Sequence, residues 1–195
     1  MIAVVKYEAG NVRSVLNALA RAGAEDVVLT ADPATLRKAD KVILPGVGEA
    51  ATALGSLRKE GLDTLIPSLK QPVLGICIGL QLLCLDSEEG DVRCLGIFPA
   101  KVKRFVPAPG IKIPHMGWNS VSEPAGPLFD GIPEGSFFYF VHSYRADVCE
   151  GTIAVSRHGG PFSAAIQADN FYGVQFHPEK SGVVGEKLLR NFISL

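Results

Sequence analysis

The chain has 195 residues, and its 19 Lys and Arg nearly balance its 20 Asp and Glu, so a net charge of −1 gives no general attraction to nucleic acid or anionic lipid. This length suits one domain, residues 1–195, which buries enough surface to fold without a metal or disulfide. The mean hydropathy is +0.23, but no apolar run reaches the ~18 residues that a membrane span requires.

The first half of the sequence alternates short apolar runs with helical patterns. We expect strands at residues 2–7, 26–30, 41–45 and 72–77, and helices at residues 11–23, 33–38 and 50–69. Strands that are apolar on both faces and separated by helices are typical of a parallel sheet. The sequence therefore predicts an α/β fold with a mostly parallel central sheet flanked by helices.

The second half changes to strands and turns. We expect strands at residues 95–105, 137–143, 151–157 and 172–177, then a helix near residues 184–192. Residues 107–117 are rich in Pro and Gly and are interpreted as an ordered surface loop, and the basic cluster at residues 101–104 as a solvated strand face. This pattern predicts an antiparallel extension on the parallel core.

The four cysteines, Cys77, Cys84, Cys94 and Cys149, lack CxxC spacing, and no histidines lie at metal-ligand intervals from them. We therefore expect reduced thiols, no metal site and no cofactor. Residues 1–6 lack the pattern of a secretion signal, so the expected location is cytoplasmic.

The segment Gly75-Ile-Cys-Ile-Gly79 follows a predicted strand and precedes a helical pattern, which is typical of a nucleophile elbow with cysteine in place of serine. Glycines two residues before and after Cys77 would let strand and helix approach closely. A helix N-terminus would favour the thiolate, and the N–H of Ile78 would point toward an oxyanion. The alternative is a buried core cysteine.

A cysteine nucleophile requires a base, and His177 in Val174-Gln-Phe-His-Pro-Glu-Lys180 is the best candidate. In an extended chain residues 177 and 179 point the same way, so Glu179 could accept the other imidazole N–H. The alternative is a structural histidine, which is the role expected of His142 and His158.

The segment Pro45-Gly-Val-Gly-Glu-Ala-Ala51 imitates a dinucleotide-binding glycine motif. Glu49 would oppose a pyrophosphate, and no second strand with a ribose-binding acid follows at the right distance. The segment fits better as a loop that offers backbone N–H groups to an oxyanion.

Together, Cys77, Gln81, His177 and Glu179 make the chain similar, over essentially its whole length, to the class I (triad) glutamine amidotransferases. Within that class it resembles the glutaminase subunits of imidazole glycerol phosphate synthases, through motifs in the same order: Tyr7-Glu-Ala-Gly-Asn-Val-Arg-Ser14, Pro45-Gly-Val-Gly48, Pro114-His-Met-Gly-Trp-Asn119, Tyr139-Phe-Val-His-Ser-Tyr144 and His177-Pro-Glu-Lys-Ser181.

The resemblance implies a nucleophile at Cys77, a general base and acid at His177 and an orienting carboxylate at Glu179. It also implies that Gly48 and Ile78 form an oxyanion hole. The main-chain amino and carboxyl groups of glutamine would be held by Gln81, Glu89, Ser143 and Tyr144. A (β/α)8-barrel cyclase partner would contact His115, Trp118, Asn119, Tyr139 and Lys180.

Two residues depart from the family pattern: Glu8 stands where glycine is usual, and Ser143 where threonine is common. Two other functions stay open from the residues. One is a cysteine hydrolase in which Asp147 or Asp169 partners His177, and the other is a catalytically silent subunit that keeps the fold for assembly only.

Overall fold

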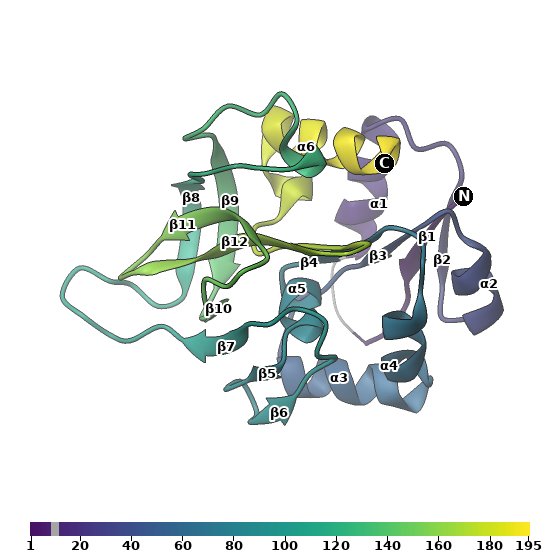
Figure 1. Cartoon of the computed structure of the whole chain (residues 1–195), viewed down its shortest axis with the longest axis horizontal. Helices are drawn as coiled ribbons and strands as arrows, with labels where there is room; N and C mark the ends of the chain where they lie inside the picture. Colours follow the sequence, from purple (N-terminus) through teal and green to yellow (C-terminus); the bar gives the residue numbers. More distant parts are fainter. Residues whose placement is uncertain (9–11) are drawn as a thin grey trace.

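The structure, a computed structural model, describes residues 1–8 and 12–195. Its centre is a seven-stranded sheet with the strand order β11-β12-β13-β4-β3-β1-β2 (Figure 1). Its strands are β1 (Ile2–Val5), β2 (Val27–Thr30), β3 (Lys41–Leu44), β4 (Val73–Ile76), β11 (Thr152–Arg157), β12 (Pro161–Ala168) and β13 (Phe171–Val174). Neighbours from β13 to β2 are parallel, and β11 and β12 extend the sheet antiparallel. The predicted fold class is confirmed.

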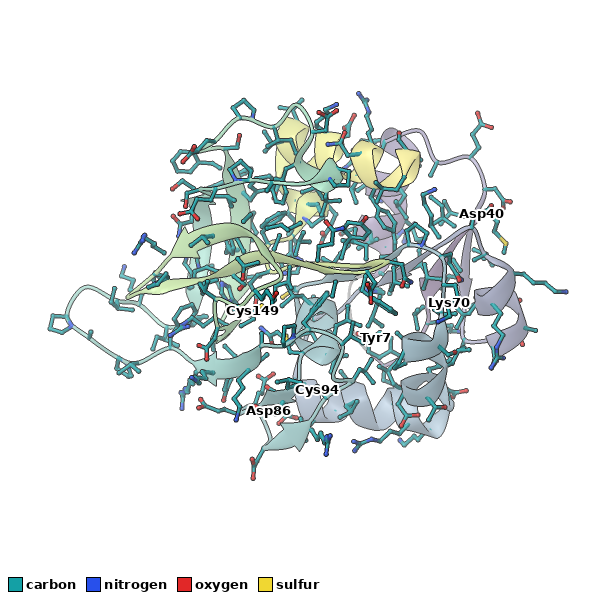
Figure 2. The ribbon with its side chains drawn as sticks, in the orientation of Figure 1. Tyr7, Asp40, Lys70, Asp86, Cys94 and Cys149 are labelled. Atoms are coloured by element: carbon teal, nitrogen blue, oxygen red, sulfur yellow. The ribbon has the colours of Figure 1, made fainter. Side chains whose placement is uncertain are left out.

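Helices cover both faces of this sheet, with α1 and α6 on one side and α3, α4 and α5 on the other (Figure 1). The helices are α1 (Val12–Arg21), α2 (Pro33–Lys38), α3 (Ala50–Lys59), α4 (Leu62–Leu65), α5 (Ile78–Leu83) and α6 (Gly182–Ser194), with 3-10 turns η1 (Ile66–Ser68), η2 (Pro127–Phe129) and η3 (Pro178–Lys180). Side chains fill the space between sheet and helices (Figure 2). Residues 9–11, where the first predicted helix was expected to begin, lie outside the described residues.

Two smaller sheets lie beside the core. One has the order β10-β7-β5-β6 and the other pairs β8 with β9. Their strands are β5 (Asp86–Ser87), β6 (Val92–Arg93), β7 (Lys101–Arg104), β8 (His115–Ser120), β9 (Phe137–His142) and β10 (Tyr144–Ala146). The basic cluster forms the exposed face of β7, as predicted, where Lys103 Nζ lies 2.5 Å from Asp147 Oδ2.

The single helix predicted over residues 50–69 is wrong, because the chain turns twice within it. Gly61 adopts a left-handed conformation with φ of 66° between α3 and α4, and Pro67 lies in η1. The turns bury Leu62, Leu65 and Ile66 against the core.

The strand predicted over residues 95–105 is confirmed only for residues 101–104. Before it, the backbone N–H groups of Leu95 and Ile97 donate to the carbonyls of Leu82 and Leu83, at 2.8 and 2.9 Å. These residues therefore satisfy the carbonyls at the end of α5, which a helix leaves without partners, instead of pairing in a sheet.

Five strands were not predicted: the short strands β5, β6 and β10, and the longer strands β8 and β12. The expected loop over residues 107–117 ends at β8, which begins at His115 and pairs antiparallel with β9. Strand β12 lies between β11 and β13, although its run of small residues, Ser163 to Ala165, gives little strand signal.

The arrangement of β3, β4 and β13 positions the site. They are parallel neighbours in which Leu44 pairs with Gly75 and Ile76 with Val174. Parallel strands end at the same edge of the sheet, which is where open α/β sheets bind ligands. The loop that begins at Pro45 follows β3, Cys77 follows β4, and His177 lies shortly after β13. These three segments therefore meet at one edge of the sheet.

Candidate active site

Cys77 lies on a sharp turn between β4 and α5. Its φ of 54° and ψ of −106° are sparsely populated by a residue with a side chain, and it is the N-cap of α5. A Cβ on Gly75 would lie 2.7 Å from the carbonyl carbon and oxygen of Gly79. The glycines thus allow the contact between strand and helix that the elbow hypothesis requires.

His177 and Glu179 form a buried pair next to Cys77. The distance from His177 Nδ1 to Glu179 Oε1 is 2.7 Å, and the two side chains are only 1% and 3% exposed. The extended backbone predicted for both residues is wrong at Glu179, which lies in the 3-10 turn η3. Pro178 starts this turn, and the turn places the carboxylate against the imidazole.

The second imidazole nitrogen of His177 faces the nucleophile. Burial opposes protonation of His177, but the Cys77 sulfur and the Glu179 carboxylate outweigh this and raise the pKa of His177 above its usual range. Nε2 is buried and makes no hydrogen bond within the described residues, and the Cys77 sulfur lies near enough to the imidazole to raise its pKa. An imidazolium beside a sulfur is the arrangement that favours a thiolate nucleophile.

A cavity of about 260 Å³ opens over the sulfur. Eight of the predicted site residues line it: Gly48, Cys77, Ile78, Gln81, Glu89, Ser143, Tyr144 and His177. Glu179 lies behind His177 and outside the cavity. The structure therefore brings the predicted nucleophile, base and binding residues to one place.

The wall of the cavity carries polar groups suited to a zwitterionic ligand. Gln81 is 1% exposed, and its Oε1 has no hydrogen-bond partner among residues 1–8 and 12–195. Glu89 Oε2 accepts the N–H of Ala50 at 2.8 Å, and burial raises the pKa of Glu89. A carboxylate and an amide oxygen at one wall can accept hydrogen bonds from an ammonium group.

The glycine-rich loop from Pro45 to Gly48 borders the same cavity. Gly48 has a φ of 107°, which favours glycine. The Tyr7 hydroxyl donates to the carbonyl of Pro45, and Tyr7 lies well inside the outline of the molecule (Figure 2). A Cβ on Gly46 would lie 2.8 Å from both the Tyr7 hydroxyl and the Ile78 Cβ.

Several residues at the site were missed from the sequence. Tyr7 was predicted only as part of a motif, with no role of its own, and Gln175, which contacts Cys77, gave no signal beyond its place two residues before His177. His142, interpreted as structural, lines the cavity. A search for polar residues at the ends of β4 and β13 would have found Gln175.

The three histidines other than His177 form a cluster. His115 Nδ1 lies 3.0 Å from His142 Nε2, and the His158 ring stacks on His115 with centroids 4.2 Å apart. Burial lowers the pKa of His115 to about 4 and that of His142 to about 3, in each case with a smaller contribution from neighbouring histidines. The His115–His142 pair is therefore neutral at pH 7.

The residues predicted to face a partner divide into two sets. Trp118 is 55% exposed, its ring lies 6.1 Å from Tyr139, and Lys180 Nζ lies 5.8 Å from the Tyr139 ring centroid. Asn119 on β8 is partly exposed, but its amide is turned away from them, with Nδ2 3.2 Å from His115 Nε2 and 3.0 Å from the Arg157 carbonyl oxygen. His115 differs from the expectation because it is 6% exposed and lies behind this surface.

Asp147 and Asp169, the two alternative carboxylate partners for His177, lie away from the imidazole. Asp147 binds Lys103 and Arg145, with the Arg145 Nη1 to Asp147 Oδ1 distance at 3.1 Å. Asp169 lies in the turn before β13, whereas His177 follows the other end of that strand. Glu179 is thus the carboxylate that contacts the imidazole.

Comparisons with known proteins show the family of the chain. The family described as "Glutamine amidotransferase class-I" matches residues 3–195. The "Imidazole glycerol phosphate synthase subunit HisH" of Bacteroides thetaiotaomicron is 56% identical, and the Escherichia coli protein of the same name is 48% identical; each alignment covers 100% of this chain and 99% of the relative.

Solved structures share the fold. A protein from Thermoplasma acidophilum described as part of a putative GMP synthase has a TM-score of 0.75 at 22% identity, over 100% of this chain and 92% of the other. A structure described as a glutamine amidotransferase has a TM-score of 0.73 at 21% identity, over 99% and 97% of the two chains. With the family match over nearly the whole length, the chain belongs to the class I glutamine amidotransferases.

Proposed function

We propose that this chain is the glutaminase subunit of an imidazole glycerol phosphate synthase. It hydrolyses glutamine to glutamate and ammonia and passes the ammonia to a cyclase partner in histidine biosynthesis. The observation that carries the proposal is the triad of Cys77, His177 and Glu179, whose free imidazole nitrogen faces the sulfur beneath the cavity. The full-length relatives that carry the synthase name support the specific reaction.

In the first half of the reaction the Cys77 thiolate attacks the side-chain amide carbon of glutamine. A carbon–sulfur bond forms, and the tetrahedral intermediate collapses as the carbon–nitrogen bond breaks. His177, held as an imidazolium by Glu179, donates its Nε2 proton to the departing nitrogen, so that ammonia leaves and a thioester remains.

In the second half water attacks the thioester. His177, now neutral, takes a proton from this water as the carbon–oxygen bond forms. The carbon–sulfur bond then breaks, its electron pair returns to the Cys77 sulfur, and the side-chain acid leaves and loses its proton to water to become glutamate. The imidazolium and thiolate are restored together.

The N–H of Ile78 and that of Gly48 form the oxyanion hole in this proposal. Ile78 is the first residue of α5, and the first N–H groups of a helix have no partner within the helix. Gly48 also lines the cavity, in a loop whose glycine-rich sequence permits two conformations.

Four residues of the cavity wall hold the main-chain groups of glutamine. The free Oε1 of Gln81 and the carboxylate of Glu89 accept from the α-ammonium group, and Ser143 and Tyr144 bind the carboxylate end. Ser143 stands where threonine is common in the family, and serine keeps the side-chain hydroxyl.

The partner is a (β/α)8-barrel cyclase that binds the surface made by Trp118, Tyr139 and Lys180, with Asn119 and His115 behind it. Aromatic and basic side chains are enriched at such interfaces. Ammonia released into neutral water becomes protonated and loses its nucleophilicity, so the partner must receive it directly. The cyclase then forms imidazole glycerol phosphate and an aminoimidazole carboxamide nucleotide.

The proposed location is the cytoplasm. None of the helices within residues 1–8 and 12–195 is long and apolar enough to cross a membrane.

The test is glutamate release from glutamine, measured for the chain alone and then with the barrel cyclase and its nucleotide ligand. We expect a low rate that rises strongly only in the full mixture, because the glycine-rich loop completes the oxyanion hole when the loaded partner binds. Cys77→Ala should abolish the activity, whereas Cys149→Ala, at a cysteine that precedes β11 and does not line the cavity, should retain it.

Three results would contradict this function. Equal turnover with and without the loaded partner would refute the regulation. Esterase activity on small acyl esters without a partner, together with indifference to Glu179→Gln, would favour the hydrolase alternative. Failure of a glutamine-analogue affinity reagent to label Cys77 would favour the silent subunit.

A further inference from the structure

Gln175 is a completely buried polar residue next to the nucleophile that the mechanism above does not use. It follows β13 directly, and its backbone N–H donates to the Ala164 carbonyl at 2.8 Å. Its side-chain Nε2 lies 3.7 Å from the Cys77 sulfur, and its Oε1 lies 3.0 Å from Gln81 Nε2. Gln175 therefore links the nucleophile to the wall of the cavity.

The orientation of both side-chain amides follows from one backbone carbonyl. Gln81 Nε2 lies 3.0 Å from the carbonyl oxygen of Tyr144, and a carbonyl oxygen can only accept. The Gln81 atom at this position must be nitrogen, so the Gln175 atom that faces the same nitrogen must be oxygen. The remaining Gln175 atom, which faces the sulfur, is then the N–H2 group. Turning Gln81 over would place its oxygen against two acceptor oxygens, and turning Gln175 over would place two N–H2 groups together.

The Tyr144 carbonyl is itself held by a second donor. His142 Nδ1 lies 2.7 Å from this oxygen and must carry the hydrogen. Because buried His142 is neutral, its Nε2 accepts from His115 Nδ1 at 3.0 Å. Asn119 Nδ2 donates to His115 Nε2 at 3.2 Å and to the Arg157 carbonyl at 3.0 Å. Hydrogen bonds of fixed direction therefore run from Asn119 to the sulfur.

We propose that Gln175 is a further catalytic residue of the glutaminase, whose side-chain N–H donates to the Cys77 sulfur. This hydrogen bond stabilises the thiolate before it attacks glutamine and again when the carbon–sulfur bond of the thioester breaks and the electron pair returns to sulfur. The inference rests on the proposed function. A hydrogen bond to a charged group of this kind corresponds to a rate effect of about 10- to 100-fold.

The first variant is Gln175→Met, which keeps the length of the side chain but removes the donor. The readout is the rate at which iodoacetamide alkylates Cys77 in the full chain at pH 7, measured by mass spectrometry of the Cys77 peptide. We expect alkylation to slow about 10- to 100-fold and glutaminase kcat to fall more than KM rises. The matched control is Gln167→Met, at a partly buried glutamine on β12 whose amide contacts Tyr172 instead.

The second variant is Gln81→Glu, which leaves Gln175 in place. It replaces the nitrogen that faces Gln175 Oε1 with an oxygen, so the Gln175 amide must turn over and direct its oxygen at the sulfur. Alkylation of Cys77 should slow by a similar factor. If Gln175→Met does not fold, as judged by circular dichroism and thermal unfolding, Gln81→Glu carries the test.

Alkylation of Cys77 at the native rate in either folded variant would overturn the proposal. Because alkylation requires no glutamine, the result is separable from the proposed function. Unchanged alkylation in a variant of an active glutaminase would refute the role of Gln175 alone. Slowed alkylation in a chain that never releases glutamate would refute the proposed function and leave the sulfur contact standing.

Discussion

Gly79 packs so closely against the end of β3 that a Cβ at this position would lie 1.9 Å from the carbonyl oxygen of Leu44. The contact is with backbone, which cannot move aside without displacing β3 from the sheet. Gly79→Ala should therefore lower the free energy of unfolding by about 3 kcal/mol or more, as measured by urea denaturation.

The chain offers a matched control at Gly55. This glycine lies in the middle of α3, and a Cβ there would meet no atom of the described residues within 4 Å. Gly55→Ala should raise the free energy of unfolding by roughly 0.5–1 kcal/mol, because alanine loses less conformational freedom in a helix. A tolerated Gly79→Ala would show that the elbow is less closely packed than described.

The backbone strain at Cys77 predicts that the nucleophile lowers stability. Its φ of 54° and ψ of −106° suit glycine better than a residue with a side chain. Cys77→Gly should be more stable than Cys77→Ala by about 1–3 kcal/mol in thermal or urea unfolding, and both should be inactive. Equal stability of the two variants would mean that the turn carries no strain.

Glu179 orients His177 and stabilises its charged form. Glu179→Gln keeps the shape but removes the negative charge beside Nδ1, so kcat should fall on the order of 10²- to 10⁴-fold with little change in KM. Steady-state kinetics of glutamate release measure this. Glu186→Gln, which removes an exposed pairing with Arg190, should leave kcat within twofold or so.

The neutral histidine pair predicts a loss of stability in acid. The pKa values of His115 and His142 are lowered to about 4 and about 3 in the folded chain, so between these values and 6.5 the unfolded chain binds more protons. This stability is complete above pH 6.5 and is lost as pH falls toward 3. In urea unfolding at pH 7, 6 and 5, His142→Leu should show a weaker pH dependence than the native chain.

If both chains lost stability equally between pH 7 and pH 5, carboxylates and not the histidine pair would account for the acid limb. His158 stacks on His115, so His158→Leu serves as a control that alters the cluster without removing the His115–His142 hydrogen bond.

Trp118 is the sole tryptophan, is 55% exposed, and packs edge-on against Tyr139. Binding of the cyclase should bury it and shift its fluorescence to shorter wavelength. Trp118→Ala should weaken the complex by more than about 2 kcal/mol in calorimetry, because buried aromatic anchors dominate such interfaces. Val183→Ala, at an exposed residue on α6, should bind normally. An unshifted Trp118 spectrum in the complex would place the interface elsewhere.

The sequence predicts the parts of the fold that depend on local pattern. The apolar runs that form β1, β3 and β4 are buried on both faces. Gly75 and Gly79 flank Cys77 at positions where a Cβ would overlap neighbouring backbone atoms. The family motifs predict most of the residues that line the cavity. These signals are strong because each follows from a steric or hydrophobic requirement at one position.

What the sequence did not predict depends on partners distant in the chain. Residues 95–100 cap α5 instead of forming a strand, and β12 is held by neighbours on both sides despite its small residues. Gln175 is likewise recognisable only when its hydrogen-bond partner Gln81, 94 positions away, is placed beside it. Gln81 in turn binds the carbonyl of Tyr144, 63 positions from Gln81. Periodicity carries no information about such contacts.

Because Ile76 pairs with Val174, catalytic activity depends on β4 and β13 being paired in the native register. Cys77 and His177 belong to segments far apart in the sequence and meet only because β4 and β13 align at this position. A slip of one residue would turn every side chain of β13 to the opposite face of the sheet. A misaligned molecule could be compact and rich in secondary structure and still be inactive. The fraction of Cys77 that reacts with a mechanism-based label in a refolded sample therefore counts the molecules in which the central sheet has assembled in the correct register.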